Sequence, residues 1–393
     1  MQSTPRERLM QYAHLLQGTL FAALEAATGV LCERARLLIA VVEMIPLSRQ
    51  LPCARGWLGR PAKDRQELAT AFIAKSVYGL QTTRQLIERL RSDRQLRCLC
   101  GWAATHQIPH ESTFSRAFQE FAETELPQRL HEALIVNTQR GRLVGHIARD
   151  STAIEARERY DTLPKHKPLP KRPRGRARKG EKALPSRRLT RQRRQTLPEM
   201  LSELPRHCSL GVKQSSKGYQ QYWRGYKLHL DVADGQVQIS CLLTAACLHD
   251  SQVAIPLATL SAGRVTSLYD LMDSAYDAQE IRQHSRSLGH VPIIAWTDRT
   301  LPINKQRART LARGDRRRIP AMERFRLPRK TPPLTPAEED RLCERTMVER
   351  VYSRLKDEFG ARFIRVRGAT KIMAHLMFGV LALTADQLLK LAG

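Results

Sequence analysis

The sequence predicts a chain in two parts, an all-helical N-terminal region followed by an α/β domain. Three observations predict it. Apolar residues recur at helical spacing in residues 7–135, strand and helix patterns alternate from residue 141 onward, and 42% of the 393 residues are hydrophobic, which suits a chain with a substantial core. We therefore expect a helical domain at residues 1–138 and an α/β domain at residues 139–393.

The N-terminal region carries three helix patterns. RQELATAFIAKSVYGL has apolar residues at helical spacing up to Gly79, and TTRQLIERLRSDRQLRCL follows with Thr82 or Thr83 as its cap. A third helix is predicted to begin near Ser112, with three phenylalanines on one side, Phe114, Phe118 and Phe121. Such a bundle permits a helix-turn-helix with three outward-facing residues, Ser115, Arg116 and Gln119. The alternative is an all-helical packing or dimerisation module.

The α/β region opens with strands. GRLVGHIARDST predicts a strand that leads to Asp150. YQQYWRGYKLHLDVADGQVQISCLLTAA predicts two strands joined by an Asp-Gly turn at 234–235. HDSQVAIPLATLSA predicts a helix capped by Asp250 or Ser251, and VTSLYDLMD predicts a further strand that ends on Asp273.

The remaining elements complete a recognisable order. Asp277 and Glu280 are expected to form a capping box for a helix that ends near Gly289. VPIIAW predicts a strand, and ERTMVERVYSRLKDEFG and KIMAHLMFGVLALTADQLLKLA predict two helices. Three strands followed by alternating helices and strands is the order of a ribonuclease-H-like α/β fold, a mixed sheet flanked by helices. Its first strand is central and lies beside the strand after the first helix, so Asp150 and Asp273 are expected at neighbouring strand ends.

Charge is the strongest global feature of the chain. The 66 Lys+Arg outnumber 38 Asp+Glu, a net charge of +28 that favours a polyanionic partner, either nucleic acid or an anionic membrane. Residues 161–195 hold 14 Lys+Arg, 2 Asp+Glu and five prolines, and residues 298–330 hold 12 Lys+Arg and 3 Asp+Glu. We expect solvated basic insertions at 161–217 and 298–340. The first is either a plain linker or an arm that contacts DNA phosphates through its basic residues, Arg172, Arg174, Arg176, Arg178 and Lys179.

Several classes of protein are disfavoured. The most apolar segment, HLMFGVLALTADQLLKLAG, is interrupted by Thr384, Asp386 and Lys390, and the N-terminus lacks a signal-peptide core. The eight cysteines are scattered, without the paired spacing of a zinc site. These features predict a reduced, cytoplasmic protein with no membrane partner.

Three carboxylates are candidates for one metal site. Two acids at neighbouring strand ends repel each other unless a cation lies between them, and Mg²⁺ or Mn²⁺ prefers such oxygen ligands. Glu349 is the third candidate, on a helix that carries Arg345, Glu349 and Lys356 on one face. With two ions bound, such a site performs in-line phosphoryl displacement.

Structural roles compete with that interpretation. Asp150 could begin an Asx turn, and Arg345–Glu349 could be an exposed salt bridge worth a few tenths of a kcal/mol. Asp250 and Asp277 are assigned to helix caps. Asp270 is a rival to Asp273 but lies three residues earlier on the same strand and therefore points to the opposite face.

The sequence resembles the DDE transposases of bacterial insertion sequences, of the IS-four-like kind, over nearly its whole length. RDSTAIEARE and LYDLMDSAYDA look like the two aspartate segments, and ERTMVERVYSRLKDEFGARFIRVRG looks like the glutamate helix. Arg345, Glu349 and Lys356 match the signature of tyrosine, two residues, arginine, three residues, glutamate, six residues and lysine, whereas Leu342 stands at the tyrosine position.

The resemblance implies a function and a set of site residues. The catalytic and metal-binding triad would be Asp150, Asp273 and Glu349, with two Mg²⁺ or Mn²⁺ ions. The chain would nick transposon ends and join the freed 3′-hydroxyl to target DNA, as a homodimer in a synaptic complex in the bacterial cytoplasm, associated with the nucleoid. Arg345 and Lys356 would contact DNA, and Trp223 either stacks on a base or packs at the core or sheet edge.

Two other functions remain open from the sequence. The first is a decayed or domesticated DNA-binding protein, against which the complete triad argues. The second is a ribonuclease-H-like nuclease that only hydrolyses, against which the helical region and the two basic insertions argue because they favour a prolonged grip on DNA.

Overall fold

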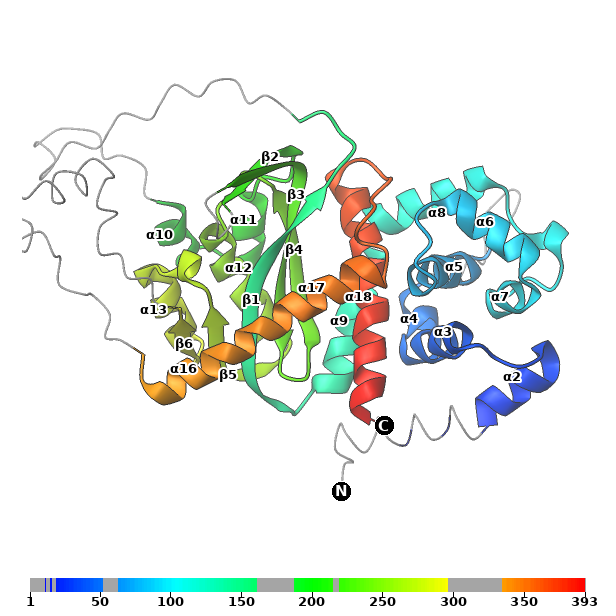
Figure 1. Ribbon diagram of the computed structural model, residues 1–393, viewed down its shortest axis with the longest axis horizontal. Coiled ribbons are helices and arrows are strands. Elements are labelled where there is room, and N and C mark those ends of the chain that lie inside the picture. Colours follow the sequence, from blue (N-terminus) through cyan, green and yellow to red (C-terminus); the bar gives the residue numbers. More distant parts are fainter. Residues whose placement is uncertain are drawn as a thin grey trace, which may run out of the picture.

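A mixed six-stranded sheet forms the centre of the α/β region in the computed structural model (Figure 1). The structure describes residues 11, 15, 19–51, 63–160, 187–214, 219–295 and 334–392. The strands are β1 (Leu143–Glu155), β2 (Ser209–Gln214), β3 (Gln220–Ala233), β4 (Val237–Ala245), β5 (Thr266–Met272) and β6 (Val291–Ile294). Their order is β2-β3-β1-β5-β6, with β4 also paired to β3. This is the ribonuclease-H-like fold that the element order predicts.

The direction of pairing divides the sheet into two halves. β1 is antiparallel to β3 and parallel to β5, which is parallel to β6. β1 is therefore central, as expected, and β5 is its neighbour. The Asp-Gly turn at 234–235 joins β3 to β4, and Gly235 has a φ of +75°, a left-handed conformation that favours glycine.

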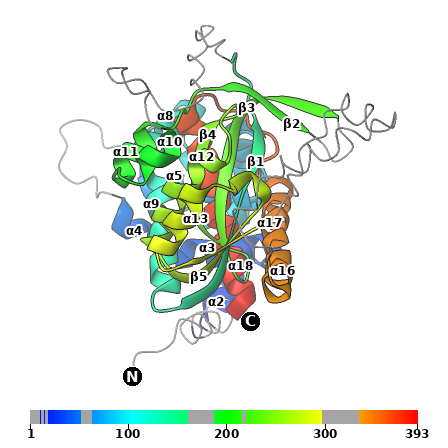
Figure 2. The same ribbon diagram turned by 90° about the vertical axis from the view of Figure 1, so that its left-hand side faces the viewer.

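Helices cover both faces of the sheet. The helices of one side are α12 (Ser251–Ala262) and α13 (Gln279–Ser287), and those of the other are α16 (Pro336–Cys343) and α17 (Met347–Asp357). Figure 2 shows these two groups on opposite sides of the strands. α12 contacts β3 and β4, whereas α17 contacts β1 and β3. Successive residues of β1 therefore point alternately toward α12 and toward α17.

The N-terminal region is helical, as predicted. Its helices are α2 (Phe21–Thr28), α3 (Glu33–Met44), α4 (Leu47–Gln50), α5 (Arg65–Val77), α6 (Thr83–Ser92), α7 (Arg94–Leu99), α8 (Glu111–Glu123) and α9 (Leu126–Gln139). Thr82 caps α6 in a capping box with Gln85. The expected phenylalanines Phe114, Phe118 and Phe121 of α8 are buried, and α8 begins at Glu111, one residue before the predicted start.

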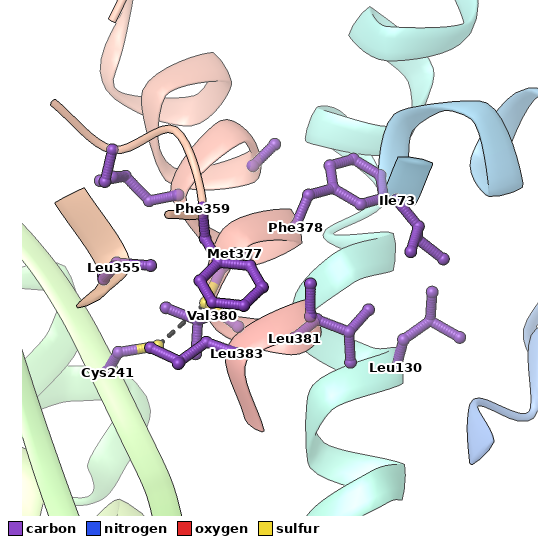
Figure 3. Packing of buried hydrophobic residues seen from close by; sticks show 14 of the residues in the cluster. Ile73, Leu130, Cys241, Leu355, Phe359, Met377, Phe378, Val380, Leu381 and Leu383 are labelled. Carbon is purple, nitrogen blue, oxygen red and sulfur yellow. Dashed lines mark hydrogen bonds between the residues drawn. The ribbon is translucent and has the colours of Figure 1, made fainter. Parts of the chain in front are cut away.

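The C-terminal helix α18 (Ala369–Ala392) lies between the sheet and the N-terminal helices (Figure 1). It contacts α3, α5, α8 and α9 on one side and β4 on the other. Phe378 of α18 stacks on Phe72 of α5 with ring centroids 5.8 Å apart, and Leu381 and Leu383 extend the same apolar packing (Figure 3). One continuous hydrophobic core thus joins the helical region to the sheet.

α18 is also the one described helix that is long and apolar enough to cross a membrane by length and composition. Its most apolar window is 83% buried inside the protein. A core helix meets the same criteria, because both environments remove the side chains from water. In this structure the apolar surface of α18 is covered by other parts of the chain.

Two local expectations were wrong. Within the predicted basic insertion 161–217, the structure contains α10 (Arg188–Gln192), α11 (Leu197–Ser202) and β2, because apolar residues such as Leu189 and Met200 pack against α12 and its neighbours. Asp277 and Glu280 form no capping box. The N-cap of α13 is Ala278 without a side-chain bond, and Asp277 pairs with Arg282 at 3.1 Å instead.

Candidate active site at the centre of the sheet

Asp150 and Asp273 lie on adjacent parallel strands. Arg149 of β1 pairs in register with Met272, the last residue of β5. The residues that follow this pair are Asp150 in β1 and Asp273 just after β5. The position of Asp150 corrects one expectation. β1 does not end there but continues to Glu155, and Ser151 is paired with His229 of β3, so Asp150 does not open a turn.

Asp273 is placed by the end of its strand. β5 stops at Met272, and the Asp273 carboxylate accepts a hydrogen bond from the backbone N–H of Ala275 at 2.9 Å. This bond caps the short 3-10 turn η3 (Ser274–Tyr276). The chain therefore turns away and leaves Asp273 beside the middle of β1. Asp150 accepts a similar local bond from the Ser151 N–H at 2.7 Å.

A tyrosine attaches α17 to this part of the sheet. The Tyr352 hydroxyl donates to the backbone carbonyl of Asp150 at 2.6 Å and accepts from the Leu230 N–H at 3.1 Å. Glu349 lies three residues earlier on α17, on the same side of the helix. Its side chain is 59% exposed. The buried tyrosine thus fixes the helix that carries Glu349 against β1 at Asp150.

Arg345 joins two of the three acids. Its Nη1 lies 3.2 Å from Asp150 Oδ2 and its Nη2 lies 3.1 Å from Glu349 Oε1. The Arg345–Glu349 pair, considered from the sequence as an alternative structural role, therefore forms, but it is part of a bridge to β1 rather than an isolated surface pair. Lys356, seven residues further along α17, donates from Nζ to Thr152 Oγ1 at 2.7 Å.

Asp250 is a fourth carboxylate that sequence reasoning assigned to a helix cap. It occupies the N-cap position of α12 but makes no side-chain cap bond. Its Oδ1 instead accepts from Lys227 Nζ at 2.9 Å, and its carboxylate also bonds Ser151. Alternation along β3 places Lys227 and His229 on the same face of the strand. Both act on Asp250, so this pair of basic side chains is the signal that could have located it.

The electrostatics of the site follow from burial and from crowding of negative charge. Burial raises the pKa of Asp150 to about 6, and the charges of Asp273 and Asp250 add to the rise, while the Ser151 N–H and Arg345 oppose it. Burial also raises the pKa of Asp273. Burial alone would raise the pKa of Asp250, but His229, Lys227 and Ser151 together lower it. The site therefore favours a bound cation or proton near Asp150.

Asp270 occupies a different environment from Asp273. It is 1% exposed, accepts from Ser285 Oγ at 2.6 Å and lies 3.3 Å from His290 Nδ1. On the neighbouring strands, Arg149 and Asp231 form a buried pair at 2.7 Å, with Ser261 of α12 bonded to the same aspartate. These groups belong to the α12 and α13 side of the sheet, opposite to α17.

Of the other residues predicted to contact DNA, the structure describes Trp223 but not the basic residues of the arm. Trp223 is half-buried on β3, where its ring lies against Gly211 of β2 and its Nε1 donates to the Tyr226 carbonyl at 3.1 Å. Its packing at the sheet edge matches one of the two roles considered for it. Five basic residues of the predicted arm lie outside the described residues: Arg172, Arg174, Arg176, Arg178 and Lys179. Most of the second basic insertion lies outside them as well.

The donor chemistry of the site fits a hard divalent cation. Asp150, Asp273 and Glu349 supply carboxylate oxygens, and the half-buried Asp150 lies close enough to other acids for their charges to disfavour its ionisation. Among the described side chains, no three histidine, cysteine or acidic groups gather closely enough to hold a metal ion. Arg345 takes part of the role of a cation by lying between Asp150 and Glu349.

Comparison with protein families identifies two matching regions. Residues 32–120 match a family described as Transposase domain (DUF772), and residues 146–385 match a family described as Transposase DDE domain. The first covers most of the N-terminal helices, and the second extends from β1 into α18. Searches of curated proteins and of solved structures found no significant match.

Proposed function

The chain belongs to the DDE transposases, and we propose that it cuts DNA at the ends of an insertion sequence and joins the freed 3′-hydroxyl to target DNA. Its proposed subfamily is IS-four-like, from the arginine, glutamate and lysine spacing on α17. The observation that carries the proposal is the register of β1 and β5, which puts Asp150 beside Asp273, with Glu349 tied to Asp150 through Arg345.

The proposed catalytic residues are Asp150, Asp273 and Glu349, which would also hold Mg²⁺ or Mn²⁺ as two ions. Bound divalent ions would activate the attacking hydroxyl and stabilise the leaving oxygen of an in-line phosphoryl displacement. The chain itself supplies the positions of the acids. The Ser151 and Ala275 N–H groups orient the two aspartates, and Tyr352 attaches α17 to β1 at Asp150.

Arg345 has two proposed roles. It neutralises Asp150 and Glu349, and it would bind a DNA phosphate once a cation takes over that neutralisation, because guanidinium groups match phosphate oxygens in a two-pronged geometry. Lys356 is proposed as a second phosphate contact beside β1. The arm residues Arg172 to Lys179 and the ring of Trp223 complete the proposed DNA-contacting set.

The proposed division of labour follows the two matched regions. Residues 1–138 would bind DNA ends or form a dimer contact, and residues 139–393 would form the catalytic domain, with basic insertions at 161–217 and 298–340. The partners are the terminal inverted repeats, target DNA and a second copy of the chain in a synaptic complex. The proposed location is the bacterial cytoplasm, at the nucleoid.

A strand-transfer assay tests this function. Labelled duplexes of the DNA that flanks the coding sequence are incubated with Mg²⁺ and wild-type protein, Asp273→Asn or Glu349→Gln. We expect joined products from the wild type alone, with DNA binding retained by both variants. The exposed Asp340 of α16 offers a matched control, Asp340→Asn, which should join DNA like the wild type.

Each failure has a definite meaning. Binding without cleavage in the wild type would indicate a decayed or domesticated DNA-binding protein. Cleavage without joining would indicate a nuclease that only hydrolyses. Joining that survives in either acid variant would exclude that acid from the catalytic set.

A further inference from the structure

A lysine is buried where the helical region meets the segment before α18, and no carboxylate of the described residues pairs with it. Lys75 of α5 is 7% exposed. Within the described part of the chain it forms no ion pair, and its hydrogen bond runs from Nζ to His375 Nδ1 at 3.4 Å. His375 Nε2 donates to the Gly360 carbonyl at 3.1 Å, which leaves Nδ1 as the acceptor of a neutral imidazole.

The state of these two groups follows from their burial. Burial lowers the pKa of His375 to about 3, so it carries no charge at neutral pH. Burial also lowers the pKa of Lys75 to about 8, so its ammonium still carries a charge there. An ammonium has three donors, and the contact with His375 uses one of them. A buried unpaired charge destabilises a fold, so the position favours an anionic ligand over a purely structural role.

Lys75 lines an open pocket of about 350 Å³. The wall of the pocket includes the start of α6, where Thr83 and Arg84 occupy the first helical positions and their N–H groups have no acceptor within the helix. Arg365 contributes a further cation. The acid of the pocket lining, Glu111, lies 3.5 Å from Arg84, and both side chains are largely exposed, so this pair neutralises the pocket only weakly.

A second hollow lies next to the pocket, on the side of the C-terminal end of α17. This smaller hollow, of about 140 Å³, is lined by Lys356 and Arg362 and shares Gln81 with the first. Lys356 donates to Thr152, two residues after Asp150 on β1. Asp357 also lines this hollow and pairs with Arg362, so Lys356 is the cation there that has no acid partner among the described residues. Lys356 thus lies between the acids and the pocket that holds Lys75.

We propose that this pocket binds one backbone phosphate of the DNA substrate, with Lys75 as the central donor and Arg365 and the start of α6 around it. The inference rests on the proposed function and adds a direction to it: the duplex would extend from the acids along α17 to the junction of α5, α6 and the segment before α18. A phosphodiester supplies the single negative charge that Lys75 lacks, and helix N-termini favour such anions.

Salt-dependent DNA binding tests the assignment without requiring catalysis. Anisotropy of a labelled duplex from the DNA flanking the coding sequence is measured in EDTA across a salt series. Lys75→Met should lower affinity about five- to tenfold at 0.1 M salt and reduce the slope of log K against log salt by about 0.9, the contribution of one phosphate contact. Lys63→Met, at an exposed lysine just before α5, is the matched control and should change neither quantity.

A second variant and a measurement with inorganic phosphate test the assignment independently of Lys75→Met. Arg365→Gln changes an exposed side chain and should also reduce the slope, so it tests the pocket even where Lys75→Met fails to fold. In the absence of DNA, inorganic phosphate at constant ionic strength should raise the Tm of the wild type more than that of Lys75→Met.

The outcomes separate the pocket from the proposed function. Unchanged affinity and slope in a folded Lys75→Met, or in Arg365→Gln, would overturn the assignment even where the wild type joins DNA. Stabilisation by phosphate with no change in DNA binding would assign the pocket to a free anion and overturn the DNA contact. A wild type that binds with these slope changes but joins nothing would keep the pocket and refute the transposition chemistry.

Discussion

Asp150→Asn should make the protein more stable at neutral pH while it abolishes catalysis. Burial raises the pKa of Asp150 to about 6 from an ordinary 3.8, so the folded state disfavours its charge. At about 1.4 kcal/mol per pKa unit, the difference corresponds to up to about 3 kcal/mol at pH 7. Asparagine keeps the shape and an acceptor for the Ser151 N–H but carries no charge.

The sign of the pH dependence provides the sharper test. Because the folded pKa lies above the unfolded one, the folded state binds the proton more tightly, and the free energy of unfolding of the wild type falls as pH rises from about 4 to about 6. The Asp150→Asn variant has no carboxyl group at this position, so its free energy of unfolding does not fall for this reason. The stability gap between the variant and the wild type should therefore open across this pH window and stay constant above it.

Urea unfolding followed by circular dichroism at pH 4.5 and pH 7.5 measures this gap. Asp340→Asn, on the exposed side of α16, is the control and should stay within about 0.5 kcal/mol of the wild type at both pH values. Mg²⁺ should raise the Tm of the wild type and not that of Asp150→Asn, because only the former has the carboxylate ligand. The reasoning would be refuted if Asp150→Asn were less stable than the wild type at pH 7.5. It would also be refuted if the difference in free energy of unfolding were the same at both pH values.

Three further substitutions probe the surroundings of the site. Asp231→Asn should destabilise the fold by about 3–5 kcal/mol in urea unfolding, because it leaves a buried arginine without its partner, and a loss under 1 kcal/mol would contradict this. Gly225→Ala should lower the Tm, because its φ is +150° and an added Cβ would lie 2.1 Å from the Ile154 carbonyl oxygen; an unchanged Tm would show that the strands adjust freely. Lys356→Met, which loses the bond to Thr152, should weaken DNA binding in EDTA with an unchanged Tm, and full affinity would exclude it from the DNA path.

Much of the local structure could be predicted from the sequence, because it depends on neighbouring residues. Thr82 and Gln85 form their capping box across one turn of helix, and the Asp-Gly turn at 234–235 joins two strands without help from the rest of the chain. The apolar residues of β1 and β5 and the helical spacing of apolar residues in α17 identified these three elements. The element order then predicted that Asp150 and Asp273 would be neighbours.

Local patterns failed where distant segments compete for the same group. Asp250 has the sequence of a helix cap, but Lys227 of β3 offers a stronger, charged partner. Asp277 has the spacing of a capping box, but Arg282 binds its carboxylate. The basic composition of residues 161–217 predicted no regular structure there, and α10, α11 and β2 were missed. A few apolar side chains attach these short elements to the core, and such a small number gives no clear pattern in the sequence.

The sequence by itself determined the type and order of most elements, the surplus of positive charge and the three candidate acids. Only the tertiary structure decided that β1 continues past Asp150, that Arg345 bridges it to Glu349 and that Lys75 is buried against His375. The physical reason is the range of the interactions. Periodicity and capping act over a few residues, whereas burial and charge pairing depend on which segments fold together, and these segments lie far apart in the chain.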